Sequence, residues 1–506
     1  MRRRIGGWAF LLLASTTAGC GDPARPTEPP PRPTFAGTSL VVAVLGDPAI
    51  VPGLRAGQGE WEASSRGSLG FREASDDPGG ADVLVFPGDR LGDLVDRGAL
   101  LALADEALVP PPPPPGGGDE AVPAPVPDAF AFKEIAPAFR DGVTKYGDDR
   151  MGLPLGGSAL VLAFRRAAFD REANRAAAAS AGIALDVPRT WADLDALARF
   201  FHGRDWDGDG KADAGIALAW ASDPEGVGDA TFLARAASLG QHPDQYSFLF
   251  DSDRMRPRVA SPPFVEALGA LVGLAKLAPP GALAFDAEAA RAAFRSGRVA
   301  LLIDRAERAS TWSEGEPVGV APLPGSDRVW NPARKAWEAP RGLNLPAYLP
   351  RGGGWLVGVA AATAHREAAT DLARYLAGPE MTNRLRSDRA FPMLAARTPQ
   401  LGQGPGDPRS APGVEPRGWT DAVARTIAGG RAVVGLRVPG ADGYLADLAK
   451  GRAEAAGGRP AEDALKAVAA AWDARTDALG RDRQTWHYRR SLNRLATEPR
   501  PPPRGK

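Results

Sequence analysis

Cysteine and histidine are scarce in this chain. Its 506 residues include one cysteine and four histidines. A single cysteine cannot form an internal disulfide, and so few Cys and His side chains exclude a zinc site built from them. The G-x-S-x-G motif is absent, and no histidine stands in a recognisable catalytic triad. These absences argue against an enzyme, although a hydrolase built on two carboxylates stays open because the chain holds 61 acidic residues.

An excess of either charge is also missing. The 61 acidic residues are balanced by 61 basic ones, so the formal net charge is zero. Proteins that bind nucleic acid depend on a broad basic field, and a neutral chain lacks one. Nucleic acid is therefore not an expected partner. The length allows two or three domains, each large enough to bury a core.

The first twenty residues are typical of a secretion signal. Three arginines follow Met1, an apolar run covers residues 8–14, and small residues lead to Cys20. The segment Thr17-Ala18-Gly19-Cys20 resembles the bacterial lipobox, although that motif usually has Leu, Val or Ile in place of Thr17. The resemblance implies lipidation of Cys20 and a membrane anchor on the extracytoplasmic side; the alternative is an ordinary secretory signal. Residues 21–37 are expected to form a Pro-rich tether.

Continuous apolar runs alternate with stretches of helical character after the tether. The runs are typical of strands buried on both faces of a sheet; they lie at residues 40–45, 82–86, 299–303, 318–323 and 355–361. Helices are expected at residues 165–181, 190–201, 366–377, 421–428 and 460–479. The alternation predicts an α/β fold.

One short loop has the residue spacing of a calcium site. Asp205, Asp207 and Asp209 occupy alternating positions before Gly210, in the pattern D-x-D-x-D-G-x-x-D. Carboxylates at this spacing converge on one ion when glycine provides a sharp turn. The Lys211 carbonyl and Asp213 would complete more of the shell, but the glutamate of an EF-hand is missing. We expect a structural Ca²⁺ loop and no other cofactor; the alternative is a solvated acidic turn.

A family resemblance is carried by segments spread over most of the chain. They include residues 81–86, 151–154, 188–191, 294–301, 321–324 and 352–355. In their order and spacing they resemble an extracellular solute-binding protein of the sugar-binding group, the receptor of an ABC importer, similar to maltose-binding proteins. The resemblance implies a two-lobed periplasmic-binding-protein fold of type II, with hinge crossings and a ligand cleft between the lobes.

The same resemblance implies how the chain divides between the lobes. The first lobe is expected at residues 38–155, with 300–350 returning to it. The second is expected at 156–299, with 355–475 returning to it. Crossings between the lobes would lie at 155–158, near 300–304 and at 355–358. Residues 476–506 are expected to form a basic, Pro-rich peripheral tail.

Ligand contacts are expected where the strands end, because ligands bind at the carboxyl ends of strands in open α/β sheets. The residues are Asp47, Phe86, Asp89, Arg90, Ser158, Trp220, Glu307, Trp312 and Trp355. Carboxylates and arginine suit sugar hydroxyls, and aromatic rings suit the apolar face of a sugar, although each ring could equally belong to the core. Ser158 and Glu307 replace an acid and a tryptophan of the maltose-binding pattern, so another sugar, a polyol or a different solute stays possible.

The expected function is therefore a lipid-anchored solute receptor in the bacterial cell envelope. It would bind a small solute, most simply a carbohydrate, by closing two lobes, and would deliver it to the membrane subunits of an ABC permease. Two alternatives remain at this point. One is a periplasmic carbohydrate-acting hydrolase, and the other is a sensing or scaffold lipoprotein without a transport role.

Overall fold

The computed structural model describes residues 34–74, 79–109, 130–388, 393–401, 412–428, 431–494 and 501–502. The predicted signal (1–20), its lipidated Cys20 and the tether up to residue 33 lie outside the described residues. Within them, no helix combines the length and apolar composition that a membrane crossing requires.

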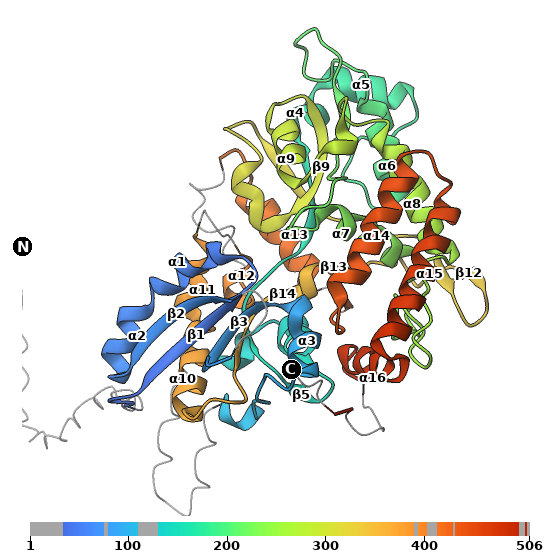
Figure 1. Cartoon of the computed structure of the whole chain (residues 1–506). Helices are drawn as coiled ribbons and strands as arrows, with labels where there is room; N and C mark the ends of the chain where they lie inside the picture. The colour runs from blue at the N-terminus through green and yellow to red at the C-terminus, as the bar shows by residue number, and fades with distance from the viewer. Residues whose placement is uncertain are drawn as a thin grey trace, which may run out of the picture.

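Two separate β-sheets form the centres of two lobes (Figure 1). The first sheet has the strand order β2-β1-β3-β14-β6. Its strands are β1 (Ser39–Leu45), β2 (Ser68–Ala74), β3 (Val83–Pro87), β6 (Leu153–Gly157) and β14 (Gly354–Val359). β1 pairs in parallel with β2 and β3, whereas β14 runs antiparallel to β3 and β6. Every residue of β3, β6 and β14 is buried, as the continuous apolar runs predict.

The second sheet has the strand order β10-β7-β9-β8. Its strands are β7 (Leu160–Arg165), β8 (Ala214–Ala217), β9 (Val299–Arg305) and β10 (Val318–Pro322). β7 is antiparallel to both β9 and β10, and β8 is parallel to β9. Shorter strands form two-stranded ladders, namely β4 (Lys145–Tyr146) with β5 (Asp149–Arg150), β11 (Val329–Asn331) with β12 (Ala336–Glu338), and β13 (Ala347–Leu349) with β15 (Ala432–Val434). The fold class is the α/β class that the sequence predicts.

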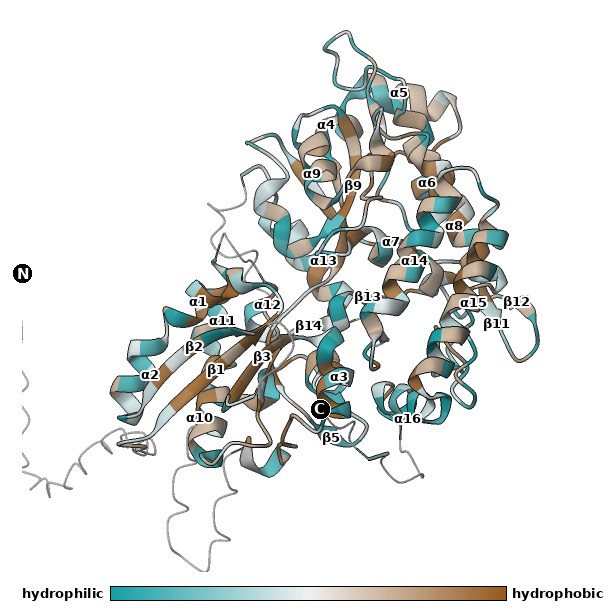
Figure 2. Ribbon diagram, viewed as in Figure 1, coloured by the Kyte–Doolittle hydropathy of each residue, from teal (hydrophilic) through white to brown (hydrophobic). Residues whose placement is uncertain are grey.

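Helices surround both sheets. Those of the first lobe are α1 (Val51–Arg55), α2 (Gln58–Ser65), α3 (Leu91–Asp96), α10 (Arg366–Leu376), α11 (Pro379–Arg386) and α12 (Thr398–Leu401). Those around the second sheet are α4 (Arg166–Asp170), α5 (Glu172–Ser180), α6 (Trp191–Phe201), α7 (Val227–Gly240), α8 (Pro262–Ala275), α9 (Ala287–Arg295), α13 (Pro416–Ala428), α14 (Ala441–Ala456) and α15 (Ala461–Leu479). Figure 2 shows the strands as the most hydrophobic elements, with hydrophilic residues on the outer helices.

The division of the chain between the lobes differs from the prediction. β9 and β10 complete the second sheet, so residues 300–322 do not return to the first lobe. β14 instead enters the first sheet between β3 and β6, and α10 and α11 pack on that sheet. Residues 355–386 therefore belong to the first lobe, although α13, α14 and α15 do return to the second. The prediction was wrong because an apolar run shows that a strand is buried and not which sheet it joins.

Two of the connections between the lobes are described in full. The first crossing is the turn from Gly157 in β6 to Leu160 in β7, where the sequence places it. The second runs from Leu349 at the end of β13 to Gly354 at the start of β14, and not through residues 300–304. Gly354 has a φ of 129°, and a Cβ there would lie 2.3 Å from the Gly156 carbonyl oxygen. Only glycine fits this conformation at that distance.

A helix that the sequence did not predict joins the lobes a further time. α16 (Arg481–Ser491) lies within the expected peripheral tail, and its side chains are hydrophilic (Figure 2). Trp486 nevertheless belongs to the hydrophobic cluster that contains the first sheet, and Tyr488, two residues later, belongs to the cluster that contains α14 and α15. A helix without an apolar stripe is typical of a bridge between domains, where polar contacts hold it.

Buried hydrogen bonds attach α16 to both lobes. On the first lobe, Asp96 of α3 accepts hydrogen bonds from His487 Nε2 at 2.7 Å and Arg483 Nε at 2.6 Å. Although burial opposes the shift, these two partners lower the pKa of Asp96. On the second lobe, the Phe250 N–H donates to the Tyr488 hydroxyl at 3.2 Å, and Arg489 donates to a backbone carbonyl at 2.9 Å. The tail is therefore a structural part of the molecule as far as residue 494.

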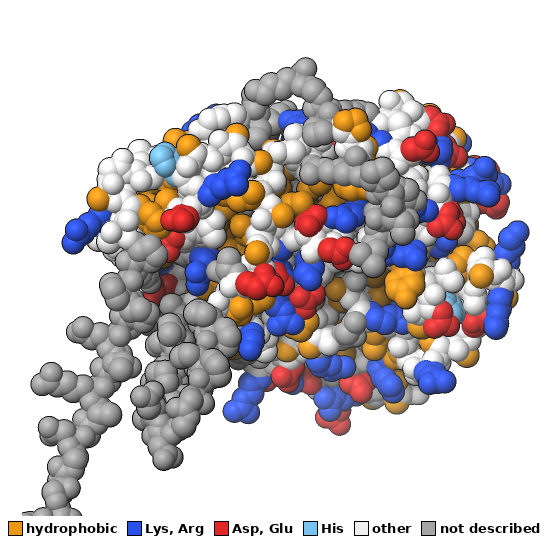
Figure 3. Space-filling model, turned by 90° about the horizontal axis from the view of Figure 1, so that it is seen from below, with side chains coloured by type: hydrophobic (Ala, Val, Ile, Leu, Met, Phe, Trp, Pro, Cys, Tyr) orange, Lys and Arg blue, Asp and Glu red, His pale blue; other side chains and the backbone are white. Residues whose placement is uncertain are grey.

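Charges of both signs are mixed over the surface. On the face shown in Figure 3, basic and acidic side chains alternate, with small hydrophobic patches between them. This face has no broad field of one sign, in agreement with the zero net charge.

Replacing Asp96 tests the role of α16. The Asp96→Asn substitution leaves Arg483 and His487 without their buried anionic partner, so we expect a loss of about 3 kcal/mol in the free energy of unfolding. Urea denaturation measures this loss. Asp482→Asn is the control, because Asp482 is an exposed acid of the same helix. Equal stabilities of the two variants would contradict the account.

Candidate ligand site between the lobes

Ser158 and Glu307 meet at the first crossing through one arginine. Ser158 follows Gly157 in the crossing, and Glu307 lies in η7 (Ala306–Thr311), just after β9. Arg305 Nε donates to Ser158 Oγ at 3.0 Å and to Glu307 Oε1 at 2.7 Å. Both Ser158 and Glu307 are buried. Glu307 Oε2 is also buried and has no hydrogen-bond donor among the described residues. This oxygen can therefore accept a further hydrogen bond beside the first crossing.

Around Glu225 the second lobe holds a cluster of paired charges. This residue precedes α7 and lies 2.7 Å from Arg291, 3.3 Å from Arg308 and 3.6 Å from Arg305. Although burial opposes the shift, these arginines lower the pKa of Glu225. Arg291 also pairs with Asp304 at 3.2 Å. The arginines are thus matched by carboxylates. This cluster of the second lobe offers hydrogen-bonding groups without a strong net charge.

On the first lobe, Asp89 lies beside the second crossing. It belongs to η2 (Gly88–Arg90), which follows β3 and packs against η8 (Arg351–Gly353). Its side chain is 2% exposed, and Arg351 Nε lies 3.1 Å from one carboxylate oxygen. Neither oxygen receives a hydrogen bond of good geometry from the described residues. Burial raises the pKa of Asp89, and the Arg351 charge opposes that rise.

Asp47, Arg90 and Trp355 lie along the same edge of the first sheet. Asp47 is exposed after β1, and its carboxylate accepts a hydrogen bond from the Ala49 N–H at 2.9 Å. Trp355 is the second residue of β14, where it pairs with Pro87, and its ring lies against Gly46. Arg90 is 3.6 Å from Asp442 of α14. The structure thus brings Asp47, Asp89, Arg90 and Trp355 to one edge, as predicted from the strand ends.

Two of the predicted aromatic contacts are core residues instead. Phe86 is fully buried in β3, where it pairs with Leu356 of β14. Trp312 is also fully buried, and its indole N–H donates to Asp304 at 2.8 Å. Neither ring offers a face to a solute in this structure. Trp220 is 6% exposed and lies against the Arg452 guanidinium.

Three residues of the site were not predicted from the sequence. Arg305 could have been found from its place, because it ends the apolar run of β9 two residues before Glu307. Arg351 directly precedes the three glycines at residues 352–354. Glu225 has no comparable feature in the sequence around it, because the arginines with which it pairs are distant from it in the sequence.

The predicted cation loop lies apart from the crossings, between α6 and β8. Asp205, Asp207 and Asp209 each place a carboxylate oxygen within 4.8 Å of the other two. Lys211 and Asp213 follow, and Asp213 directly precedes β8.

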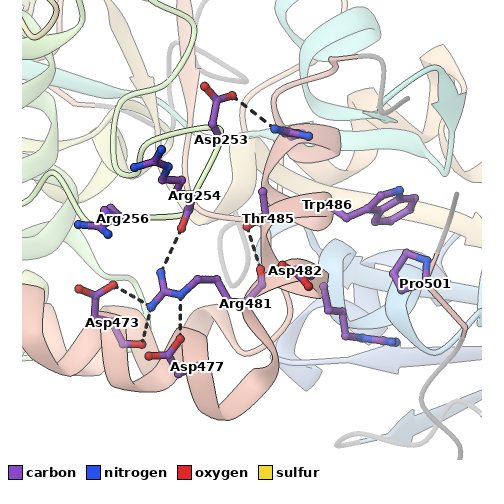
Figure 4. Close-up of a pocket in the computed structure, with 12 residues that line it drawn as sticks. Asp253, Arg254, Arg256, Asp473, Asp477, Arg481, Asp482, Thr485, Trp486 and Pro501 are labelled. Atoms are coloured by element: carbon purple, nitrogen blue, oxygen red, sulfur yellow. Dashed lines mark hydrogen bonds and ion pairs between the residues drawn. The ribbon is translucent and has the colours of Figure 1, made fainter. Parts of the chain in front are cut away.

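Several cavities lie in the described part of the chain. One of about 160 Å³ is bounded by the start of α7, η8 and α14, and Asp229, Arg351 and Asp442 contribute to its wall. Another of about 760 Å³ lies between α15, α16 and the loop at residues 253–256. Figure 4 shows Arg481 there between Asp473 and Asp477, at 3.0 and 2.7 Å. The smaller cavity adjoins the second crossing through Arg351, whereas the larger one lies beside α16 and away from the residues predicted to bind a ligand.

Comparison with solved structures agrees with this fold. The chain is 18% identical to a solute-binding protein of an ABC transporter from Agrobacterium radiobacter K84 in complex with ribitol, with a TM-score of 0.60 over 87% of this chain and 100% of that one. It is 16% identical to a counterpart from Agrobacterium vitis S4 with bound D-mannitol, with a TM-score of 0.58 over 88% and 99% of the two chains. It is 18% identical to maltose-bound MalE3 of T. maritima, with a TM-score of 0.57 over 86% of this chain and 99% of that one. The two-lobed fold is therefore the one that the sequence predicts.

A family assignment comes from the sequence itself. No curated protein matches the chain. Residues 62–383, more than half of the 506, match the family described as "Bacterial extracellular solute-binding protein". Proteins of this family are receptors and not enzymes, so the hydrolase alternative is excluded. The chain belongs to the bacterial extracellular solute-binding proteins.

Proposed function

We propose that this protein captures a neutral, polyhydroxylated solute between its two lobes and delivers it to an ABC permease. Its structural relatives carry ribitol, D-mannitol and maltose, and these compounds share closely spaced hydroxyl groups. The proposal takes the chemical class from those relatives. The position of the proposed solute site is inferred from the residues of this chain.

Two buried carboxylates carry the proposal. Asp89 belongs to the first lobe and Glu307 to the second, and each lies beside a crossing. Both oxygens of Asp89 and one of Glu307 lack a hydrogen-bond donor among the described residues. A buried acceptor that stays unpaired is costly, and a solute hydroxyl supplies the missing donor. Donors from one molecule to both residues would favour the closed arrangement of the lobes.

The charges around the site favour a neutral solute. Arg305 is matched by Glu225 and Glu307, and Asp89 is matched by Arg351. A charged solute would have to displace one of these pairs and leave its partner buried without a counter-ion. Hydroxyl groups can join the existing pairs as further donors and acceptors.

The membrane anchor is a separate part of the proposal. Cys20 follows Thr17-Ala18-Gly19 at the end of an apolar segment, in the lipobox-like pattern. We infer that a lipid on Cys20 holds the receptor at the extracytoplasmic side of a membrane, with the Pro-rich segment as a spacer. A tether of this kind keeps the receptor close to its permease.

Substitution of the two carboxylates tests the solute site. A thermal-shift screen against ribitol, D-mannitol, tagatose and maltose identifies a bound compound, since a ligand of the folded state raises the melting temperature. With that compound, we expect Asp89→Asn and Glu307→Gln each to weaken binding by about 10- to 100-fold, because each loses a charge-assisted hydrogen bond. Isothermal titration calorimetry measures the affinities.

Glu367→Gln serves as the matched control, because Glu367 is an exposed acid of α10. The affinity of this control variant for the identified solute should equal that of the unmodified protein. The proposed site is wrong if all three variants bind the solute equally well. The proposed solute class is wrong if no compound of the panel binds.

Replacement of the cysteine tests the anchor. We expect the Cys20→Ala protein, expressed in a bacterium, to leave the membrane fraction and to incorporate no labelled fatty acid, because the acceptor thiol is gone. Membrane fractionation with fatty-acid labelling measures both. Equal membrane retention of the two proteins would contradict a lipid anchor at Cys20.

A further inference from the structure

The loop at residues 205–213 has the form of an ion-binding turn. Its base is closed by two backbone hydrogen bonds, from Gly203 N–H to the Asp213 carbonyl at 2.8 Å and from Asp213 N–H to the Arg204 carbonyl at 2.9 Å. Within it, Asp205, Asp207 and Asp209 bring their carboxylates within 4.8 Å of one another at the surface. Like charges at this separation repel each other, so the arrangement is costly without a cation.

Backbone donors hold these three carboxylates in place. Asp205 Oδ1 and Oδ2 accept hydrogen bonds from Gly208 and Gly210, at 2.6 and 3.0 Å. Asp207 and Asp209 each use Oδ1 to accept one from the residue two positions later. Within the described segments, Asp207 Oδ2 and Asp209 Oδ2 receive no such backbone bond. The Lys211 ammonium, 3.4 Å from Asp209 Oδ2, is 63% exposed and is therefore easily displaced.

Asp213 provides an independent observation that points to a cation ligand. Its side chain is 0% exposed, and neither carboxylate oxygen receives a hydrogen bond of good geometry from the described residues, although the Trp206 backbone N–H is close enough to oppose the rise that burial causes in its pKa. The Asp207 and Asp209 carboxylates are close enough to act on it electrostatically. Its cationic neighbour is Arg298, whose Nε lies 3.6 Å away, and that side chain is 44% exposed and also donates to the Ala212 carbonyl. A buried carboxylate with so little compensation is typical of a metal ligand.

From this geometry we infer that residues 205–213 bind one Ca²⁺ ion, with carboxylate ligands from Asp205, Asp207, Asp209 and Asp213 and a carbonyl ligand from Lys211. All of these ligands are oxygens, which suit Ca²⁺ and Mg²⁺ but not softer metals. Ca²⁺ is favoured because a flexible loop can supply its larger and less regular coordination shell, whereas Mg²⁺ demands an octahedron.

The ion would fix the junction between α6 and β8. Trp206 is 2% exposed, and the Asn174 side chain donates to its carbonyl at 2.8 Å, so one end of the loop is already attached to α5. Asp213 directly precedes β8, the edge strand of the second sheet. The expected role is stability of the second lobe, and it does not depend on the identity of the solute.

Terbium luminescence tests the site directly, because Trp206 stands between two of the proposed ligands and can sensitise a bound Tb³⁺ ion. We expect emission that saturates with Tb³⁺ and is displaced by Ca²⁺ at up to about 5 mM, a few times the weakest Kd of extracellular calcium modules, which is about 1 mM. Excess Mg²⁺ should displace it far less. Calcium should also raise the melting temperature of the purified protein relative to EDTA.

Two variants separate a metal ligand from a structural residue. Asp213→Asn and Asp207→Asn should each weaken Ca²⁺ binding by about tenfold or more, since each removes a ligand charge. In EDTA, Asp213→Asn should melt at the same temperature as the unmodified protein or above it, because a buried charge is gone. Asp207 is exposed, so its substitution tests binding without risk to the fold.

Asp327→Asn, an exposed acid on another loop, is the control for the loss of one charge and should leave Ca²⁺ binding unchanged. The inference is overturned if the unmodified protein takes up no Ca²⁺ at up to about 5 mM. It is also overturned if the Asp207 and Asp213 variants bind Ca²⁺ as tightly as the control.

Discussion

The close approach of two backbone segments between the lobes determines the rest of this structure. Gly157 of the first crossing pairs with Gly354, where the second crossing enters β14. A Cβ on Gly354 would collide with the Gly156 carbonyl, and one on Gly88 would lie 2.4 Å from the Gly352 carbonyl. Because no side chains intervene, the two crossings lie side by side at the end of the first sheet. Asp89 and Glu307 lie beside these crossings, one on each lobe, and the proposed solute site uses both of them.

α16 adds a link of a different chemical kind. The crossings are joined by backbone pairing, whereas α16 is held by the Asp96, Arg483 and His487 contacts on one lobe and by the Tyr488 contact on the other. In Figure 1 this helix lies on the opposite side of the molecule from α1 and α9. A link on that side restricts separation of the lobes there, so relative motion is expected to be largest between α1 and α9.

Much of the architecture could be predicted from the sequence. Continuous apolar runs identified β1, β3, β9, β10 and β14, and the family resemblance placed the first crossing at residues 155–158. The assignment of strands to sheets could not be predicted, because β9 and β14 are equally apolar and only pairing distinguishes them. α16 was missed because most of its buried residues are polar, so it has no hydrophobic periodicity. In the site, a strand end led to Asp89 and the resemblance to maltose-binding proteins led to Glu307, but the burial of Phe86 and Trp312 depends on packing from distant segments.

The central claim is that a solute draws the two lobes together, and the distance between them tests it most directly. Cys20 is the one cysteine of the chain, so a Cys20→Ala protein can be labelled at introduced cysteines alone. Ala63 of α2 and Ala292 of α9 are exposed helical positions on the two lobes. With spin labels at Ala63→Cys and Ala292→Cys, double electron–electron resonance reports this distance. The account predicts that a saturating bound solute shifts the distribution to shorter distances. An unchanged distribution at saturation would contradict it.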